Sequence, residues 1–139
     1  MSLERFCRKP VVTVPSTKTV HDVAAIMRER HVGAVLIVDK DRPVGIVTDR
    51  DIVLRSVADA RDAKTTPVTD VMSTGLTVVR REDKLDDAVS AIRSAGVRRV
   101  PIVDAAGAAV GMVTLDDLVV LMAGELGAAA GAVRSNRGP

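Results

Sequence analysis

Apolar residues form two kinds of run along this chain, and each kind occurs twice. Continuous, mostly β-branched runs at Ala34–Val38 and Val100–Val103 are typical of buried strands. After a polar turn, each is followed by a second apolar run that predicts an antiparallel partner strand, at Val44–Val47 and Ala109–Val113. The pattern therefore predicts two β-hairpins of the same kind in one chain.

Segments with apolar residues at helical spacing lie on both sides of each hairpin. One begins near Val20 and ends before Gly33, and its counterpart runs from Asp83 to Ala95. Further helices are predicted to begin at Thr48 and Thr114. Short strands and helical lead-ins complete each copy, at Val11–Val14 and Leu76–Val79 for the strands and at Leu3–Cys7 and Val68–Met72 for the lead-ins.

This repeated order indicates a tandem duplication, in which Thr48 corresponds to Thr114, 66 positions later. We predict a first repeat with its lead-in over residues 1–60 and a linker with the second repeat over residues 61–126. Residues 127–139, Gly/Ala-rich and then polar, are predicted to form a disordered tail. Since each repeat has only about 50 structured residues, near the lower limit for a stable core, we expect both to fold as one unit.

Composition narrows the function. Only one residue of 139, Phe6, is aromatic, so the chain lacks the stacking platforms on which single-stranded nucleic acid usually binds. The 20 basic and 18 acidic residues are mixed along the chain, which is typical of an ordinary solvated surface, so nucleic-acid binding is not expected. The lone Cys7 and the lack of an N-terminal secretion segment fit a reducing cytoplasm. The longest apolar stretches, 105–115 and 118–124, are too short to span a bilayer, so no membrane is expected.

Both hairpins lead into the pattern Thr-x-x-Asp, formed by Thr48 with Asp51 and by Thr114 with Asp117. One interpretation is structural, because the threonine can cap the following helix and the aspartate can complete a capping box. The other is binding, because a helix N-terminus suits a phosphate and a carboxylate can accept hydrogen bonds from both hydroxyls of a ribose. The two roles can coexist, and the pattern alone does not choose between them.

The copies differ around this motif. Arg98 and Arg99 precede the second hairpin, where the first copy has a glycine and an alanine, and their guanidinium groups could neutralise phosphates or simply be solvated. Arg50, inside the first motif, is a further candidate for phosphate binding, and its counterpart Asp116 has the opposite charge. Pro101 has no amide hydrogen, so we expect it on an edge strand or, alternatively, beside a bound base.

A tandem β-α-β-β-α unit whose hairpins end in Gly-x-x-Thr-x-x-Asp resembles a pair of cystathionine-β-synthase (CBS) motifs, a Bateman module, over about residues 10–126. The resemblance implies a mixed α/β (α+β) fold, with the two motifs packed about a pseudo-twofold axis and clefts that bind adenine nucleotides such as AMP, ADP or ATP. It implies that backbone groups near Thr13 and Val78 meet the edge of the base. The aspartates of the two motifs would then hold ribose, and their threonines and the arginines would hold phosphate.

No enzyme is predicted, because Cys7 has no evident base, His21 and His31 lack further metal ligands, and no phosphate-binding loop or dinucleotide fingerprint occurs. We expect a regulatory module that needs no cofactor or metal, senses an adenine nucleotide and signals to an unknown partner by a conformational change. The alternative is a ligand-free interaction module. The segment Leu115–Leu126 is apolar nearly all round, so we expect homodimerisation through it and through Ile52–Val57.

Overall fold

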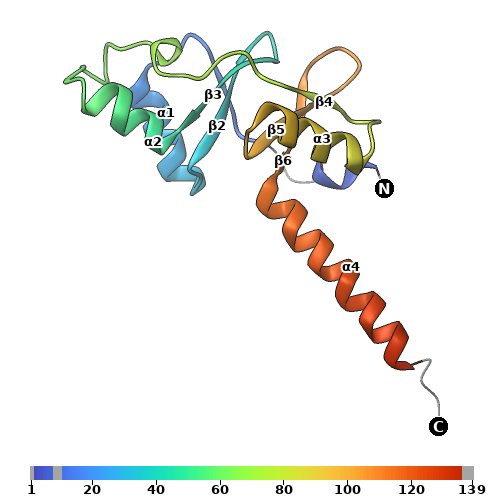
Figure 1. Ribbon diagram of the computed structural model, residues 1–139. Coiled ribbons are helices and arrows are strands. Elements are labelled where there is room, and N and C mark those ends of the chain that lie inside the picture. The colour runs from blue at the N-terminus through green and yellow to red at the C-terminus, as the bar shows by residue number, and fades with distance from the viewer. Residues whose placement is uncertain (1, 8–10, 136–139) are drawn as a thin grey trace.

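The computed structural model describes residues 2–7 and 11–135, which form two similar lobes with a long C-terminal helix projecting from the second (Figure 1). Each lobe has a three-stranded sheet whose first two strands are parallel and whose last two are antiparallel. The predicted α/β (α+β) fold of two tandem units is confirmed. In chain order, the elements are η1 (Leu3–Cys7), β1 (Thr13–Pro15), α1 (Val20–Arg30), β2 (Ala34–Asp39), β3 (Arg42–Thr48), α2 (Asp49–Ile52), the π-helical turn η2 (Val53–Val57), η3 (Val68–Asp70), β4 (Val79–Arg80), α3 (Leu85–Ala95), β5 (Arg99–Val103), β6 (Ala109–Thr114) and α4 (Leu115–Ser135).

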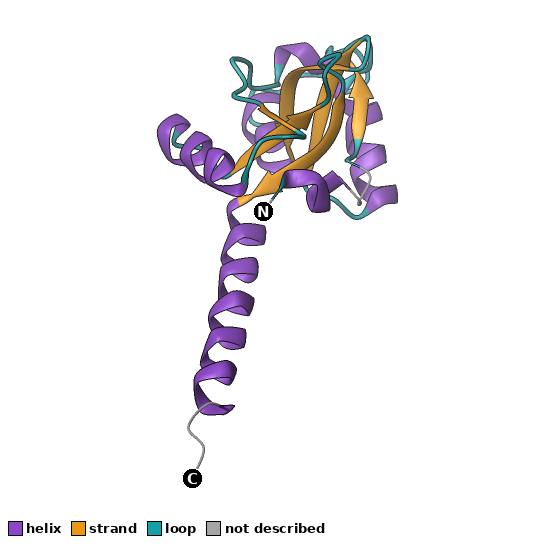
Figure 2. Ribbon diagram, turned by 90° about the vertical axis from the view of Figure 1, so that its right-hand side faces the viewer, coloured by secondary structure: helices purple, strands orange, loops and turns teal. Residues whose placement is uncertain are grey.

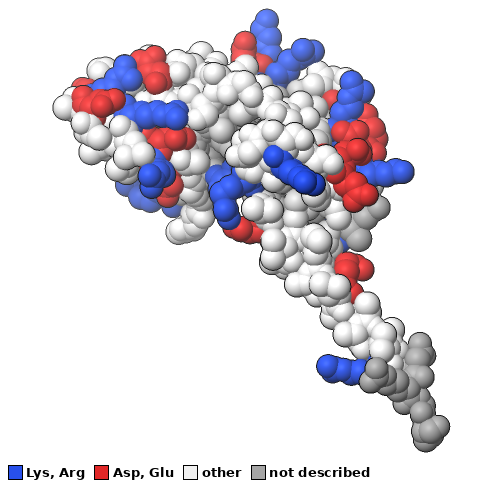
Figure 3. Space-filling model, viewed as in Figure 1, with Lys and Arg blue, Asp and Glu red and all other residues white. Residues whose placement is uncertain are grey.

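Each lobe has its own core of branched aliphatic side chains. In the first, Val35 and Ile37 of β2 pack with Val23 of α1, and in the second, Ile102 of β5 packs with Ile92 of α3. Figure 2 shows the helices lying beside the strands while α4 leads away from both sheets. Charged side chains of both signs are mixed over the visible surface of the lobes, as the sequence predicts (Figure 3).

Each of the two lead-in helices, η1 and η3, packs against the lobe formed by the other repeat. Leu3 of η1 is fully buried in the core of the second lobe, and its N–H group donates to the carbonyl of Asp83 at 3.2 Å. Val68 of η3 is fully buried in the core of the first lobe, and its N–H group donates to the carbonyl of Lys18 at 2.9 Å. Each lobe is therefore completed by the segment that precedes the other repeat, so the predicted grouping of η1 with the first repeat describes chain order and not packing.

A glycine in each hairpin makes room for these lead-ins. A side chain at Gly111 would place its Cβ atom 2.9 Å from the carbonyl oxygen of Phe6 in η1. A side chain at Gly45 would overlap Met72, which follows η3. The glycine that both motifs share is thus required by close packing of a lead-in against the strand.

Pro101 lies in β5, the central strand of its sheet, so its predicted place on an edge strand is wrong. In the first lobe, the N–H group of the corresponding residue, Leu36, donates to the carbonyl of Val12 at 3.0 Å. Pro101 has no N–H group to donate, and β4 pairs with β5 only from Val79 onward. This explains why β4 is shorter than the predicted strand Leu76–Val79, and why the segment before it lies outside the sheet.

The C-terminal segment also differs from its prediction. Instead of a disordered tail from residue 127, α4 continues through Ser135, while residues 136–139 lie outside the described part of the chain. The run Ala128–Ala130 favours this, because alanine has the highest helix propensity.

By length and composition α4 could cross a membrane, with a mean hydropathy of 1.4. The expectation that the stretch 118–124 is too short is therefore wrong, because α4 joins it to the alanine-rich segment, whereas most of the stretch 105–115 lies in β6 and the turn before it. Glu125 near its middle argues against a span, because a carboxylate at the centre of a bilayer costs about 3 kcal/mol.

Candidate functional site

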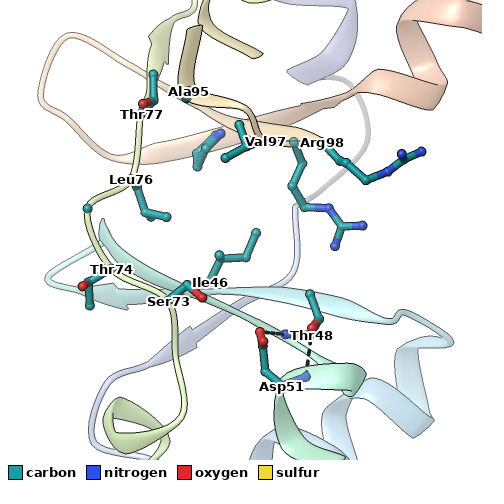
Figure 4. A pocket seen from close by; sticks show the side chains of 13 residues that line it. Ile46, Thr48, Asp51, Ser73, Thr74, Leu76, Thr77, Ala95, Val97 and Arg98 are labelled. Carbon is teal, nitrogen blue, oxygen red and sulfur yellow. Dashed lines mark hydrogen bonds between the residues drawn. The ribbon is translucent and has the colours of Figure 1, made fainter. Parts of the chain in front are cut away.

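A cleft of about 400 Å³ lies between the two lobes (Figure 4). We call it the interlobe cleft. The first lobe lines it from β3 and α2, the second lobe from the end of α3 and the start of β5, and the segment between η3 and β4 closes it. Its lining residues are Ile46, Thr48, Asp51, Ser73, Thr74, Gly75, Leu76, Thr77, Ala95, Val97, Arg98, Arg99 and Pro101. One Thr-x-x-Asp motif and two of the three predicted arginines, Arg98 and Arg99, therefore meet in one place.

The threonine and aspartate of each motif form a capping box. The N–H group of Thr48 donates to Oδ2 of Asp51 at 2.9 Å, and the N–H group of Asp51 donates to Oγ1 of Thr48 at 3.1 Å (Figure 4). In the second copy, the corresponding distances between Thr114 and Asp117 are 3.3 and 3.1 Å. The structural interpretation of both motifs is confirmed.

Capping leaves the other polar atoms of the first motif available to a ligand. The hydroxyl of Thr48 accepts one hydrogen bond and keeps its own hydrogen to donate. Oδ1 of Asp51 takes no part in the cap, and its ionic partner, Nη2 of Arg55, lies 3.8 Å away. One donor and one anionic acceptor thus remain on the wall of the interlobe cleft.

The first turn of α2, in contrast, has no free amides for a phosphate. The N–H group of Asp49 donates to the carbonyl of Gly33 at 3.0 Å, and that of Arg50 donates to Oδ1 of Asp49 at 2.9 Å. The next amide, that of Asp51, is bound to Thr48. The backbone amides at the start of α2 therefore do not form the predicted phosphate-binding site. Binding of an anion in the cleft would depend on side chains.

Arg98 can supply a positive charge for an anion in the cleft. It lines the interlobe cleft from the second lobe, and Thr48 lines the same cleft from the first lobe (Figure 4). It also pairs with Oδ1 of Asp116 at 3.1 Å, but the two side chains are 71% and 82% exposed. An ion pair this exposed contributes little free energy, so Arg98 can turn to an anion in the cleft at low cost.

A second hollow, of about 530 Å³, adjoins the interlobe cleft and shares Thr48 and Arg99 with it. We call it the central hollow. It is also lined by Arg50 and Thr114, so it joins the starts of α2 and α4. Four of the predicted site residues, two threonines and two arginines, meet here.

The remaining predicted residues lie apart from these two sites. Thr13 lines a separate hollow of about 280 Å³ with Glu29 and Arg30. Val78 and Asp117 line neither the interlobe cleft nor the central hollow. By the repeat, the second cleft would use residues 8–10, which lie outside the described residues, so its lining is incomplete here.

Sequence reasoning missed the closing segment Ser73–Thr77 and the turn at Ala95 and Val97. Pro101 could have indicated the closing segment. In the first copy the N–H group of Leu36 donates to the carbonyl of Val12, but Pro101 has no N–H group to donate to the corresponding carbonyl, that of Thr77. Gly96 could have indicated the turn, because a glycine commonly ends a helix in the left-handed conformation, and here it ends α3 with a φ of 64°.

Comparison with known proteins identifies relatives over most of the chain. The family model described as "CBS domain" matches twice, at residues 3–58 and 68–124. The chain is 41% identical over 110 residues to the CBS domain-containing protein YhcV of Bacillus subtilis, a match that covers 79% of this chain and 77% of that protein. It is 35% identical over 120 residues to the uncharacterized protein MK0525 of Methanopyrus kandleri, covering 86% of this chain but 61% of that longer protein.

Solved structures of similar fold include two with bound adenosine compounds. The CBS domain protein PAE2072 of Pyrobaculum aerophilum, complexed with AMP, is 28% identical with a TM-score of 0.74, over 85% of this chain and 90% of that chain. The CBS domain pair of protein MJ0100, in complex with 5′-methylthioadenosine and S-adenosyl-L-methionine, is 25% identical with a TM-score of 0.74, over 90% of this chain and 98% of that chain.

Proposed function

Because the chain belongs to the CBS domain family, with two tandem CBS motifs, we propose that it is a regulatory module that binds an adenine nucleotide between its lobes and signals by a change of conformation. The interlobe cleft carries the proposal: Thr48 and Asp51 keep a donor and an acceptor that their cap does not use, and Arg98 faces them from the other lobe. The adenosine compounds bound to two structural relatives support this ligand class.

Each part of a nucleotide has a matching group in the proposed site. Ile46, Leu76 and Val97 supply apolar walls for the base, whose amino group can donate to the carbonyl of Thr77. Oδ1 of Asp51 accepts from the ribose hydroxyls. The cleft volume of about 400 Å³ is within the range of small-molecule sites.

The hydroxyl of Thr48 and the guanidinium groups of Arg98 and Arg99 would hold the first phosphate. Because the central hollow adjoins the cleft, Arg50 and Thr114 would meet the further phosphates of ADP or ATP. We propose a second site at the corresponding place in the other copy, at Asp117 and Thr13, with the cap of Thr114 and Asp117 already formed. We also propose that the protein acts as a cytoplasmic homodimer, without enzymatic activity, metal or cofactor.

Titration calorimetry of the full chain with AMP, ADP and ATP tests the proposal, using Asp51→Ala and its matched control Asp22→Ala. Asp22 completes a similar capping box with Thr19, at 3.0 and 3.3 Å, but does not line the cleft. Each variant should lose some stability by losing its cap. Only Asp51→Ala should also weaken nucleotide binding, by about tenfold or more, because it removes the charged acceptor for ribose.

The ligand-free interaction module predicts a different result. All three nucleotides would then produce no heat and no thermal stabilisation, and the two variants would differ from the wild type only in stability. A 260 nm absorber released from the freshly purified protein would identify a bound nucleotide directly, because the chain has no Trp or Tyr.

A further inference from the structure

Within the described part of the chain, α4 has no packing partner along most of its length. Leu118 is its one buried residue, although its 21 residues extend about 30 Å. Val119, Met122, Leu126 and Val133 are each more than half exposed. Gly124, Gly127 and Gly131 each disfavour the helix by about 1 kcal/mol relative to alanine, and a helix without tertiary packing is marginal in water. A stable α4 therefore needs a surface to pack against.

The apolar residues of α4 recur at alternating intervals of four and three. The series is Leu115, Val119, Met122, Leu126, Ala129 and Val133. This is the spacing of positions d and a in a heptad repeat, which is the pattern of a coiled-coil seam. Leu118, which packs against the second lobe, lies beside this seam and not on it. Leu115, the first seam residue, is half-buried against the same core, and the seam is exposed from Val119 onward. Figure 3 shows that the visible surface of α4 is mostly uncharged.

We propose that α4 pairs with α4 of a second copy as an antiparallel, two-stranded coiled coil. The seam is self-complementary about position 124. Met122 then lies opposite the partner's Leu126, Val119 opposite the partner's Ala129, and Leu115 opposite the partner's Val133. A two-fold axis produces each of these contacts twice, as in other isologous dimers.

Charges on α4 favour the antiparallel orientation. Asp116 and Arg134 lie on the same flank of the seam, at opposite ends of the helix. In an antiparallel pair that flank faces itself, so Arg134 approaches the partner's Asp116 at both ends, and the helix dipoles also oppose each other. Glu125 approaches the partner's Glu125 at the centre, which is one repulsive contact against two attractive ones. A parallel pair would instead place the two acidic helix starts side by side.

The seam extends beyond the repeat. The second family match ends at residue 124, so the second half of the seam, from Leu126 to Val133, lies outside both matches. The first copy has no counterpart to this part of the seam, because its helix ends with η2 and the polar linker follows. The proposed pairing needs this extension, because each seam residue inside the match lies opposite one beyond it, and it does not depend on nucleotide binding.

Light scattering of the full chain at about 100 μM tests the pairing, because dimer content depends on protomer concentration. We expect a dimer for the wild type and a monomer for Leu126→Glu, which places a charge in the seam. The matched control is Val120→Glu, which changes an equally exposed valine off the seam and should remain dimeric. A monomeric wild type, or identical behaviour of both variants, overturns the proposal. So does flotation of the wild type with phosphatidylcholine vesicles, which would mean that lipid covers α4.

Single cysteines test the orientation, in a Cys7→Ser background that removes the native thiol. Val119→Cys and Ala129→Cys chains, mixed and oxidised, should form a disulfide between them. Each alone should not, because identical positions lie about 15 Å apart along the axis when the helices are antiparallel. Cross-linking of either protein with itself would show a parallel pair and overturn the proposal.

Discussion

Leu3 is the third residue of the chain, yet its side chain is fully buried in the second lobe. Terminal residues are usually tolerant of substitution because they lack packing. A buried leucine replaced by alanine, in contrast, costs about 2 to 5 kcal/mol, from lost burial and from the cavity left behind. We therefore expect Leu3→Ala to lower the free energy of unfolding by about 3 kcal/mol, a large part of the roughly 5 to 15 kcal/mol of a typical domain.

Urea denaturation followed by far-ultraviolet circular dichroism measures this, since the chain has no Trp or Tyr for fluorescence. Glu4→Ala is the matched control, because Glu4 is the exposed neighbour of Leu3 in the same helix and should change stability by less than about 0.5 kcal/mol. If Leu3→Ala cost no more than Glu4→Ala, η1 would not be docked in the second lobe. The exchanged lead-ins also predict a single transition for both lobes, and two separate transitions would contradict that coupling.

Two further predictions concern close packing and pH. Gly111→Ala should destabilise the fold by about 2 to 3 kcal/mol, and more than Gly45→Ala, because the added Cβ meets the Phe6 backbone in the first case and a flexible methionine side chain in the second; equal urea midpoints for the two variants would refute this. The backbone hydrogen bond from Thr19 lowers the pKa of Asp22 below its usual 3.8, so its carboxylate stabilises the fold above about pH 4 and this contribution is lost as the pH falls through the lowered pKa. Asp22→Asn should therefore reduce stability near neutral pH and progressively less in acid, and a pH-independent difference from the wild type in urea titrations would contradict the assignment.

What the sequence predicts well here is local. The strands at Ala34–Asp39 and Arg99–Val103 and the caps at Thr48 and Thr114 follow from runs of branched residues and from side chains three positions apart. The exchange of the lead-ins is not local, because periodicity does not show which lobe buries Leu3.

Pro101 illustrates the same limit. The sequence shows that this residue has no amide hydrogen, but the order of the strands decides how that absence affects the sheet. Because Pro101 lies in the central strand, it shortens the neighbouring strand β4 and leaves the segment before β4 free to line the cleft. A proline on the outer side of an edge strand would not have had this effect.

Two differences between the copies lie at the interlobe cleft. Both copies keep the capping box and the glycine that admits a lead-in, so these features serve the fold. Arg98 replaces Gly33, and Pro101 replaces Leu36, and both new residues line the interlobe cleft. One substitution adds a cation, and the other frees a backbone carbonyl from the sheet. The two halves therefore share a scaffold but offer different chemistry, so the two proposed sites would differ in their affinity for an anionic ligand.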